Sequence, residues 1–398
     1  MVRADGEEVP FRGLRARLRN TASRERRRAL WEAGLDVTRA LEPHLRRLVE
    51  AAHAAARSLG AADYVSWRAG LSGFDPDFLL RETAVVLDET AGPYEDLLGW
   101  FARRELGLRV RDLGGWDLPR LLRGGRHDAH FPPGEMVESV GSFVRAMGLD
   151  PLAGGRIELD LEPRPLKSSR AFCSPVRVPR DVRLVVLPSG GADDWRAFLH
   201  ELGHALHFAY VDPEAAFEDR CLGDDSVTET YAALFDHWLL LPGWLREARG
   251  LADPRDVVLL GTFEELYLLR RYAAKLRYEL ELHARGPDPG LAARYAEELG
   301  RATGVPAPPE RWLEDVDPRF YVVSYLQAWM LCGLLRRALR ERFDEDWFRN
   351  PRAGPFLAGL FARGQRDTAA ELAALLGAGP LGFGELLAWV REGLEGRT

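Results

Sequence analysis

Hydrophobic residues recur every three or four positions along most of this chain, the spacing that predicts amphipathic helices. A long early example runs from residue 21 to 59, with charged residues on its other side and Gly60 placed to end the helix. The same spacing predicts helices over residues 75–89, 93–105, 133–147, 257–284, 291–303 and 318–343. The pattern therefore predicts a mainly α-helical fold.

The spacing changes to a period of about two between residues 156 and 188. Residues 157–161 alternate between apolar and charged side chains, and residues 182–187 form a β-branched run that ends at Pro188. We expect a small β-sheet here, directly before the next helix. An edge strand of such a sheet can hydrogen-bond an extended peptide, or the sheet can simply close the core.

The helix that follows the sheet carries the pattern His-Glu-x-x-His. Apolar residues from Trp195 to Ala209 predict a buried helix, and Asp193 or Asp194 is the expected N-cap. His200 and His204 are four positions apart, so they share one helix face with Cβ atoms about 6 Å apart.

Two imidazoles placed in this way can bind a single Zn²⁺ ion. Glu201 projects about 100° round the helix from His200, so it cannot share the ligand face but can reach a metal-bound water. We therefore expect His200 and His204 to be zinc ligands and Glu201 to be a general base.

A catalytic zinc site needs a third protein ligand and one position open to water. Glu229 is the best candidate, in a second apparent helix over residues 227–238. Asp236 lies seven positions later on the same face, where it could hold a ligand imidazole by its second ring nitrogen. His237 is the alternative third ligand, although it is rotated away from Glu229 and adjoins apolar residues.

The other histidines near these segments fit structural roles better. His207 is expected to be a hydrogen-bonded core residue. His127 and His130 are three positions apart and could bind metal in principle, but no helix with a carboxylate adjoins them.

These residues resemble a known peptidase family. The run from Leu199 to His207 is similar to the signature of the thimet oligopeptidase and oligoendopeptidase F peptidases, and Glu229 with Trp238 resembles their third-ligand helix. The likeness continues through Asp160, Arg164, Lys167 and residues 171–173 upstream, and through the tyrosine motif at residues 320–325 downstream.

The resemblance implies a zincin-type helical metallopeptidase, with the small sheet next to the zinc helix and a substrate cleft between helical lobes. It also implies that Tyr325 or Tyr321 faces the zinc and donates a hydrogen bond to the oxyanion of the transition state. It favours the peptide-binding interpretation of the sheet edge.

Two features depart from the family pattern. The family usually has a histidine shortly before the tyrosine motif, whereas residues 311–317 here contain none. The chain is also shorter than typical members, and the shortfall falls in the N-terminal helical half. One transition-state donor is therefore absent or replaced, and the restriction on substrate size is open.

Composition adds few constraints. The chain has 398 residues, is 46% hydrophobic and carries a net charge of −7, which argues against nucleic acid as the main partner. Three isolated cysteines suggest a reducing compartment without disulfides. No signal peptide or long apolar segment is apparent, so we expect a cytoplasmic protein that is not membrane-bound.

The sequence suggests an N-terminal helical region over residues 1–150 and a catalytic region over 151–398, together forming one structural unit. We expect one Zn²⁺ per chain and hydrolysis of short oligopeptides. The alternatives are a metallocarboxypeptidase, a catalytically silent zinc protein that binds peptides or a partner, and an enzyme for a nonpeptide amide. Peptide preference and oligomeric state stay open.

Overall fold

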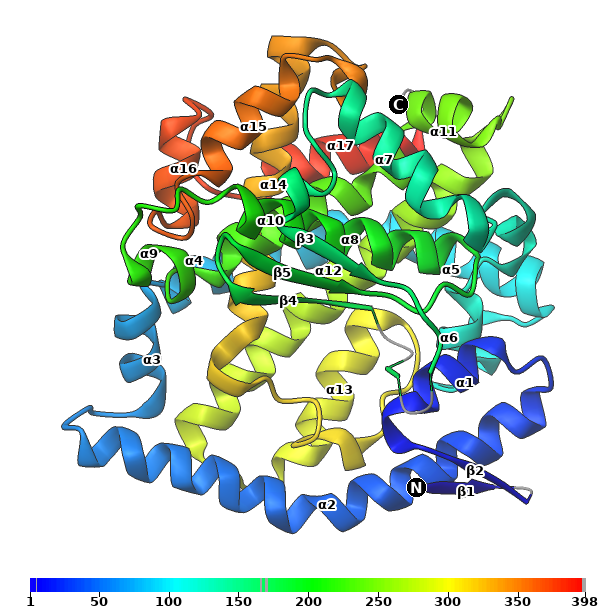
Figure 1. The fold of residues 1–398 in the computed structure, drawn as a ribbon. Coiled ribbons are helices and arrows are strands. Elements are labelled where there is room, and N and C mark those ends of the chain that lie inside the picture. The colour runs from blue at the N-terminus through cyan, green and yellow to red at the C-terminus, as the bar shows by residue number, and fades with distance from the viewer. Residues whose placement is uncertain (5, 165–166, 169–170, 396–398) are drawn as a thin grey trace. The chain divides into compact units, whose positions relative to one another are not determined.

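Helices dominate the computed structural model, which describes residues 1–398 apart from 5, 165–166, 169–170 and 396–398 (Figure 1). The first nine helices are α1 (Leu14–Asn20), α2 (Arg24–Ser58), α3 (Tyr64–Ser72), α4 (Pro76–Glu89), α5 (Ala91–Phe101), α6 (Leu118–Leu121), α7 (Met136–Ala146), α8 (Ala192–Tyr210) and α9 (Phe217–Cys221). The others are α10 (Asp225–Asp236), α11 (Pro242–Arg249), α12 (Arg255–Arg285), α13 (Leu291–Thr303), α14 (Tyr321–Phe343), α15 (Ala353–Phe361), α16 (Ala369–Leu375) and α17 (Gly384–Leu394). The mainly helical fold expected from the sequence is confirmed.

Five short strands form two small sheets in the described residues. An N-terminal hairpin joins β1 (Val2–Ala4) to β2 (Glu7–Val9). The second sheet has the order β3-β5-β4, from β3 (Ile157–Asp160), β4 (Phe172–Arg177) and β5 (Asp181–Val185). Strand β5 is parallel to β3 and antiparallel to β4, so β4 is an edge strand.

The chain divides into two compact units, each built from two stretches of sequence. Unit 1 contains Met1–Arg123 and Phe263–Val323, and unit 2 contains Gly124–Thr262 and Ser324–Thr398. The sequence instead suggested a division at residue 150. Residues 263–323 group with the N-terminal helices because α12 and α13 share a buried core with α2.

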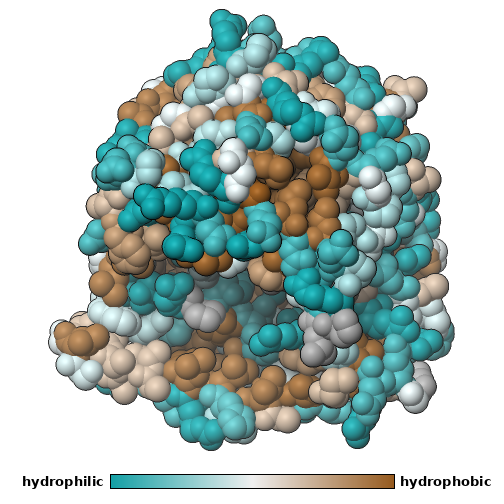
Figure 2. All heavy atoms as spheres, viewed as in Figure 1, coloured by the Kyte–Doolittle hydropathy of each residue, from teal (hydrophilic) through white to brown (hydrophobic). Residues whose placement is uncertain are grey.

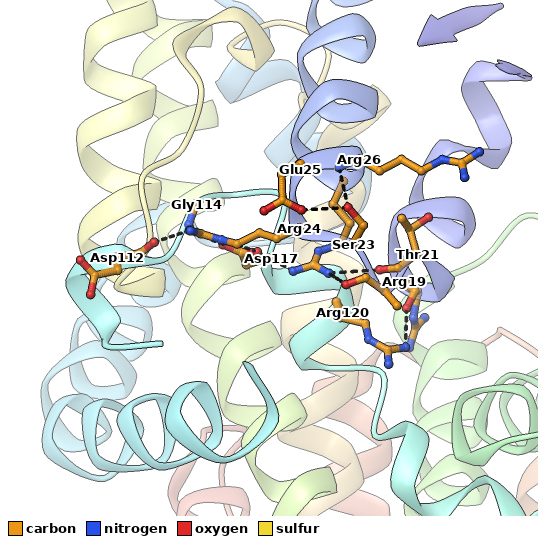
Figure 3. Close-up of polar contacts among 12 residues, drawn as sticks. Arg19, Thr21, Ser23, Arg24, Glu25, Arg26, Asp112, Gly114, Asp117 and Arg120 are labelled. Carbon is orange, nitrogen blue, oxygen red and sulfur yellow. Dashed lines mark hydrogen bonds and ion pairs between the residues drawn. The ribbon is translucent and has the colours of Figure 1, made fainter. Parts of the chain in front are cut away.

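The core of unit 1 combines aromatic and aliphatic side chains from these three helices and the loop after α13. Its buried members include Val49, Tyr278, Leu282, Leu291, Tyr295 and Trp312. A buried carboxylate also links segments of unit 1. Asp117 accepts hydrogen bonds from Arg24 and from the amide of Gly114 (Figure 3). Arg27 binds the same carboxylate at 2.8 Å, which joins the start of α2 to the loop before α6.

Unit 2 holds the sheet and the two helices that carry the predicted zinc ligands. Helix α8 packs on β4 and β5, and α10 packs along α8 (Figure 1). Behind them lie four tryptophans that are each at most 1% exposed, namely Trp195, Trp238, Trp244 and Trp347. The ring centroids of Trp238 lie 6.0 Å from Trp244 and 6.2 Å from Trp347. Helices α8 and α10 therefore pack on a close-packed aromatic core.

Figure 2 shows hydrophobic side chains at several places on one face, set among hydrophilic ones. The large exposed hydrophobic residues of unit 2 include Phe172 and Val176 of β4 and Phe217 of α9, with Leu222 just after α9. Arg220 of α9 donates a hydrogen bond to the carbonyl of Val178, so α9 lies beside the end of β4. In the described part of the chain, no helix combines the length and apolar character needed to cross a membrane.

Candidate active site

Helix α8 presents the His-Glu-x-x-His pattern and begins at Ala192, ahead of both aspartates that the sequence suggested as its N-cap. Its N-cap is Gly191, and neither Asp193 nor Asp194 caps the helix with its side chain. The carboxylate of Asp194 instead accepts hydrogen bonds from the amides of Ser189 and Gly190. The acidic residue therefore orders the loop between the sheet and α8, and the prediction of an aspartate cap was wrong.

Helices α8 and α10 approach each other closely at Gly203. A Cβ atom at this position would lie 2.6 Å from the carbonyl oxygen of Tyr231 and 2.7 Å from the Cα of Ala232. Only glycine fits there without moving α10. This contact brings Glu229, on the first turns of α10, next to the histidines of α8.

His200, His204 and Glu229 form one cluster, as expected from the sequence. One ligand atom from each lies within 4.8 Å of the others, and no second group of this kind is found in the described residues. The Oε2 atom of Glu229 is 3.4 Å from Nε2 of His200 and 3.7 Å from Nε2 of His204. Two imidazole nitrogens and one carboxylate oxygen facing a common point are the donor set that Zn²⁺ prefers, so these residues fit the ion.

The second nitrogen of each imidazole is held by a residue of α10. Nδ1 of His200 lies 3.0 Å from the Asp236 carboxylate, and Nδ1 of His204 lies 2.8 Å from the hydroxyl of Thr228. These contacts orient both rings so that Nε2 faces Glu229. The partner role predicted for Asp236 agrees with this geometry. Thr228 was not foreseen, because a threonine inside a helix carries no distinctive signal in sequence.

The two histidines differ electrostatically because their partners differ. Burial disfavours the charged form of His200, but hydrogen bonds with Asp236 and Glu229 outweigh it and raise the pKa of His200 to about 10. Burial lowers the pKa of His204 to about 4, since its close partner Thr228 is neutral. Burial also opposes ionisation of Asp236, yet Arg196 and His200 lower the pKa of its carboxyl.

Glu201 stands outside the ligand cluster and faces the sheet. Its Oε2 atom accepts a hydrogen bond of 2.8 Å from the backbone N–H of Cys173 on β4. The carboxylate is therefore fixed by the outer side of the edge strand. Burial and the nearby Glu201 charge raise the pKa of the Cys173 thiol far above its usual range, so the thiol stays protonated.

The remaining sequence candidates lie as follows. His207 is buried and hydrogen-bonds the carbonyl of Gly364 at 3.2 Å, which confirms its structural role. His237 is buried against the ring of Trp389 and lies outside the ligand cluster. Tyr321 and Tyr325 both lie on α14, but Tyr321 belongs to unit 1 and Tyr325 to unit 2. The roles expected for the two tyrosines stay predictions.

No protein-family model matches the chain, and no curated protein matches it. Solved structures do match over nearly the whole chain. PZ peptidase A, determined with an inhibitor, superposes with a TM-score of 0.71 at 14% identity and covers 99% of this chain and 72% of its own.

Two bacterial structures give the same result. One from Bacillus anthracis, assigned as an oligoendopeptidase F, has a TM-score of 0.67 at 15% identity, covering 99% of this chain and 70% of its own. One from Chlamydophila abortus, assigned as a peptidase, has a TM-score of 0.68 at 13% identity, covering 97% of this chain. Our chain spans 66% of the Chlamydophila protein's length, less than two thirds. The chain has the fold of the oligoendopeptidase F peptidases, in a shorter form, as the resemblance of its motifs predicted.

Proposed function

We propose that this chain is a zinc-dependent metallopeptidase that hydrolyses peptide bonds in short oligopeptides. The observation that carries the proposal is the convergence of Nε2 of His200, Nε2 of His204 and Oε2 of Glu229, while Glu201 lies apart from them beside an edge strand. A purely structural zinc site has no use for a separate carboxylate of this kind.

Each residue has a distinct task in the proposed reaction. When bound, Zn²⁺ supplies a water of lowered pKa and polarises the carbonyl it contacts. The Glu201 carboxylate would act as general base and then as general acid, taking a proton from the attacking water and passing it to the leaving amine. Tyr325 or Tyr321 donates a hydrogen bond to the developing oxyanion, and removing one such donor typically costs about 3 kcal/mol of barrier height.

Strand β4 is the proposed peptide-binding edge. An extended peptide can add to an open strand through backbone hydrogen bonds, while its side chains enter neighbouring pockets. The hydrogen bond from the Cys173 N–H to Glu201 supports this role, because it brings the outer side of β4 next to the residue that we propose as general base. The exposed side chains of Phe172 and Val176 on the same strand would favour apolar substrate side chains.

The test combines metal analysis with peptide cleavage. Zinc content is measured by mass spectrometry, and a mixed peptide library is digested with the wild type, Glu201→Gln and Glu214→Gln. Glu214 is exposed, so its variant controls for the loss of one negative charge in unit 2. We expect one zinc per chain in all three proteins and loss of internal cleavage in Glu201→Gln alone.

Other outcomes would redirect the assignment. Release of single residues from the C-terminus alone would identify a metallocarboxypeptidase. Zinc binding without cleavage of any peptide by the wild type would refute the peptidase proposal and favour a zinc protein that binds peptides. Absence of zinc in every variant would remove the basis of the mechanism.

A further inference from the structure

A hollow lies within unit 1 and shares no residue with the His-Glu-x-x-His site. Its volume is about 680 Å³, and residues of α4, α5, α12 and α13 line it. Pockets of this size hold small organic ligands in many proteins. Two arginines without a charged partner in the residues that the structure describes, Arg270 and Arg277, form part of its wall.

Arg270 of α12 is the most buried of the arginines that line the hollow, with 7% of its surface exposed. Its guanidinium donates to the carbonyls of Leu87 and Ala302 and to the hydroxyl of Thr90, at 2.7–2.8 Å. These three bonds use the N–H of Nε and both of Nη1, so the two N–H groups of Nη2 have no partner among the described residues.

All the partners of Arg270 are uncharged, which separates it from other buried cations of unit 1. Arg27 pairs with Asp117 at 2.8 Å, and Lys275 pairs with Asp317 at 2.8 Å. Removing a cation from water without a counter-ion costs several kcal/mol. Burial accordingly lowers the pKa of Arg270.

Arg277 adds a second uncompensated charge to the same wall. It follows Arg270 by seven positions, so the two side chains leave the same face of α12 about 10.5 Å apart along its axis. Arg277 is half-buried, and it makes no hydrogen bond or ion pair within the described part of the chain.

Acidic residues near the hollow do not neutralise these two arginines. Glu298 is buried, but it is already paired with Arg294 at 2.6 Å and Arg301 at 2.5 Å. Asp88 and Glu95 also line the hollow, and both are exposed. Water and salt screen exposed charges far more than buried ones, so the buried wall of the hollow is positive.

We propose that this hollow is an anion-binding site, in which Nη2 of Arg270 and the guanidinium of Arg277 hold a carboxylate or a phosphate group. Guanidinium groups bind both anions through paired N–H donors. The volume admits an organic anion considerably larger than the charged group itself. This site is independent of the proposed peptidase activity, because it uses other residues and requires no zinc.

Binding is measured by isothermal titration calorimetry with inorganic phosphate and with succinate, each against chloride at equal ionic strength. The variants are Arg277→Gln, Glu95→Gln and Arg285→Gln. Arg285 lies on the same helix outside the hollow and already pairs with Glu281, so it controls for loss of a positive charge on α12. Arg277 is the better target because replacing Arg270 would also remove its bonds to the carbonyls of Leu87 and Ala302 and to the hydroxyl of Thr90.

We expect at least one of the two anions to bind, with affinity about tenfold weaker in Arg277→Gln and unchanged in Arg285→Gln. Glu95→Gln should bind more tightly, since it removes a like charge. Preference for phosphate or for succinate identifies the class of ligand, and either preference supports the site. Equal affinity in Arg277→Gln and the wild type, or no binding of either anion beyond chloride, would overturn the proposal.

Discussion

Substitution of Gly203 by alanine tests how the contact between α8 and α10 builds the site. The added Cβ would meet the carbonyl oxygen of Tyr231 at 2.6 Å, whereas ordinary contacts of this kind begin near 3.4 Å. The two helices must therefore separate by about 0.8 Å, because the atoms in the way belong to the backbone of α10. Overpacking of this kind typically costs about 1–3 kcal/mol of folding stability.

For the stability of Gly203→Ala, the steric cost and the higher helix propensity of alanine partly cancel. The displacement of the metal-binding residues has no such compensation. Alanine is a better helix former than glycine by about 1 kcal/mol, which offsets part of the steric cost. Glu229 moves with α10, however, and active sites tolerate displacements of only about 0.5 Å. We therefore expect a modest fall in stability and a loss of zinc affinity of roughly tenfold or more.

The assay compares urea unfolding and competition with a fluorescent zinc chelator for the wild type, Gly203→Ala and Gly300→Ala. Gly300 lies inside α13, where a Cβ would come no closer than 3.7 Å to any neighbour. Gly300→Ala should therefore be slightly stabilised, with unchanged zinc affinity. Wild-type zinc affinity in a fully stable Gly203→Ala protein would refute the reasoning.

Three further predictions address other residues. Asp236→Asn should lower zinc affinity by about 10- to 100-fold, because His200 loses its charged partner; chelator competition checks this, and an unchanged affinity would contradict it. Burial lowers the pKa of His283 to about 3, so its contribution to stability is complete above pH 6.5 and is lost as the pH falls. The loss should reach about 2 kcal/mol by pH 5; His283→Phe should reduce this dependence in urea unfolding, and an identical dependence would argue against His283. Arg319 has φ of +63°, so Arg319→Gly should stabilise unit 1 by about 1 kcal/mol in the same assay, and a destabilised variant would show that the side chain outweighs the backbone strain.

The long helices and the ligand cluster could be predicted from the sequence because both depend on local spacing. The range 291–303 matches α13 residue for residue, and 75–89 differs from α4 by one residue. The spacing of His200 and His204 fixes their shared face, and Glu229 followed from the apolar pattern of a second helix.

Features that depend on contacts between distant segments could not be predicted. Strand β4 has no apolar alternation, since all six of its residues are half-buried or exposed, and it pairs with β5 without that signal. The backbone bond from Cys173 to Glu201 leaves no trace in residue type. The grouping of α12 and α13 with the N-terminal helices likewise depends on the core around Tyr278 and Trp312.

The outer side of β4 also limits self-association. Backbone groups of alternate residues point to the same side of an antiparallel strand, so those of Pro175 face outward like those of Cys173. The Cys173 N–H already donates its hydrogen bond to Glu201, and Pro175 has no backbone N–H. A regular sheet between two copies needs successive donors along this edge, and exposed edges with such donors promote aggregation. The edge therefore offers carbonyl acceptors for the short peptide that we propose binds there, and its lack of free donors disfavours growth into an intermolecular sheet.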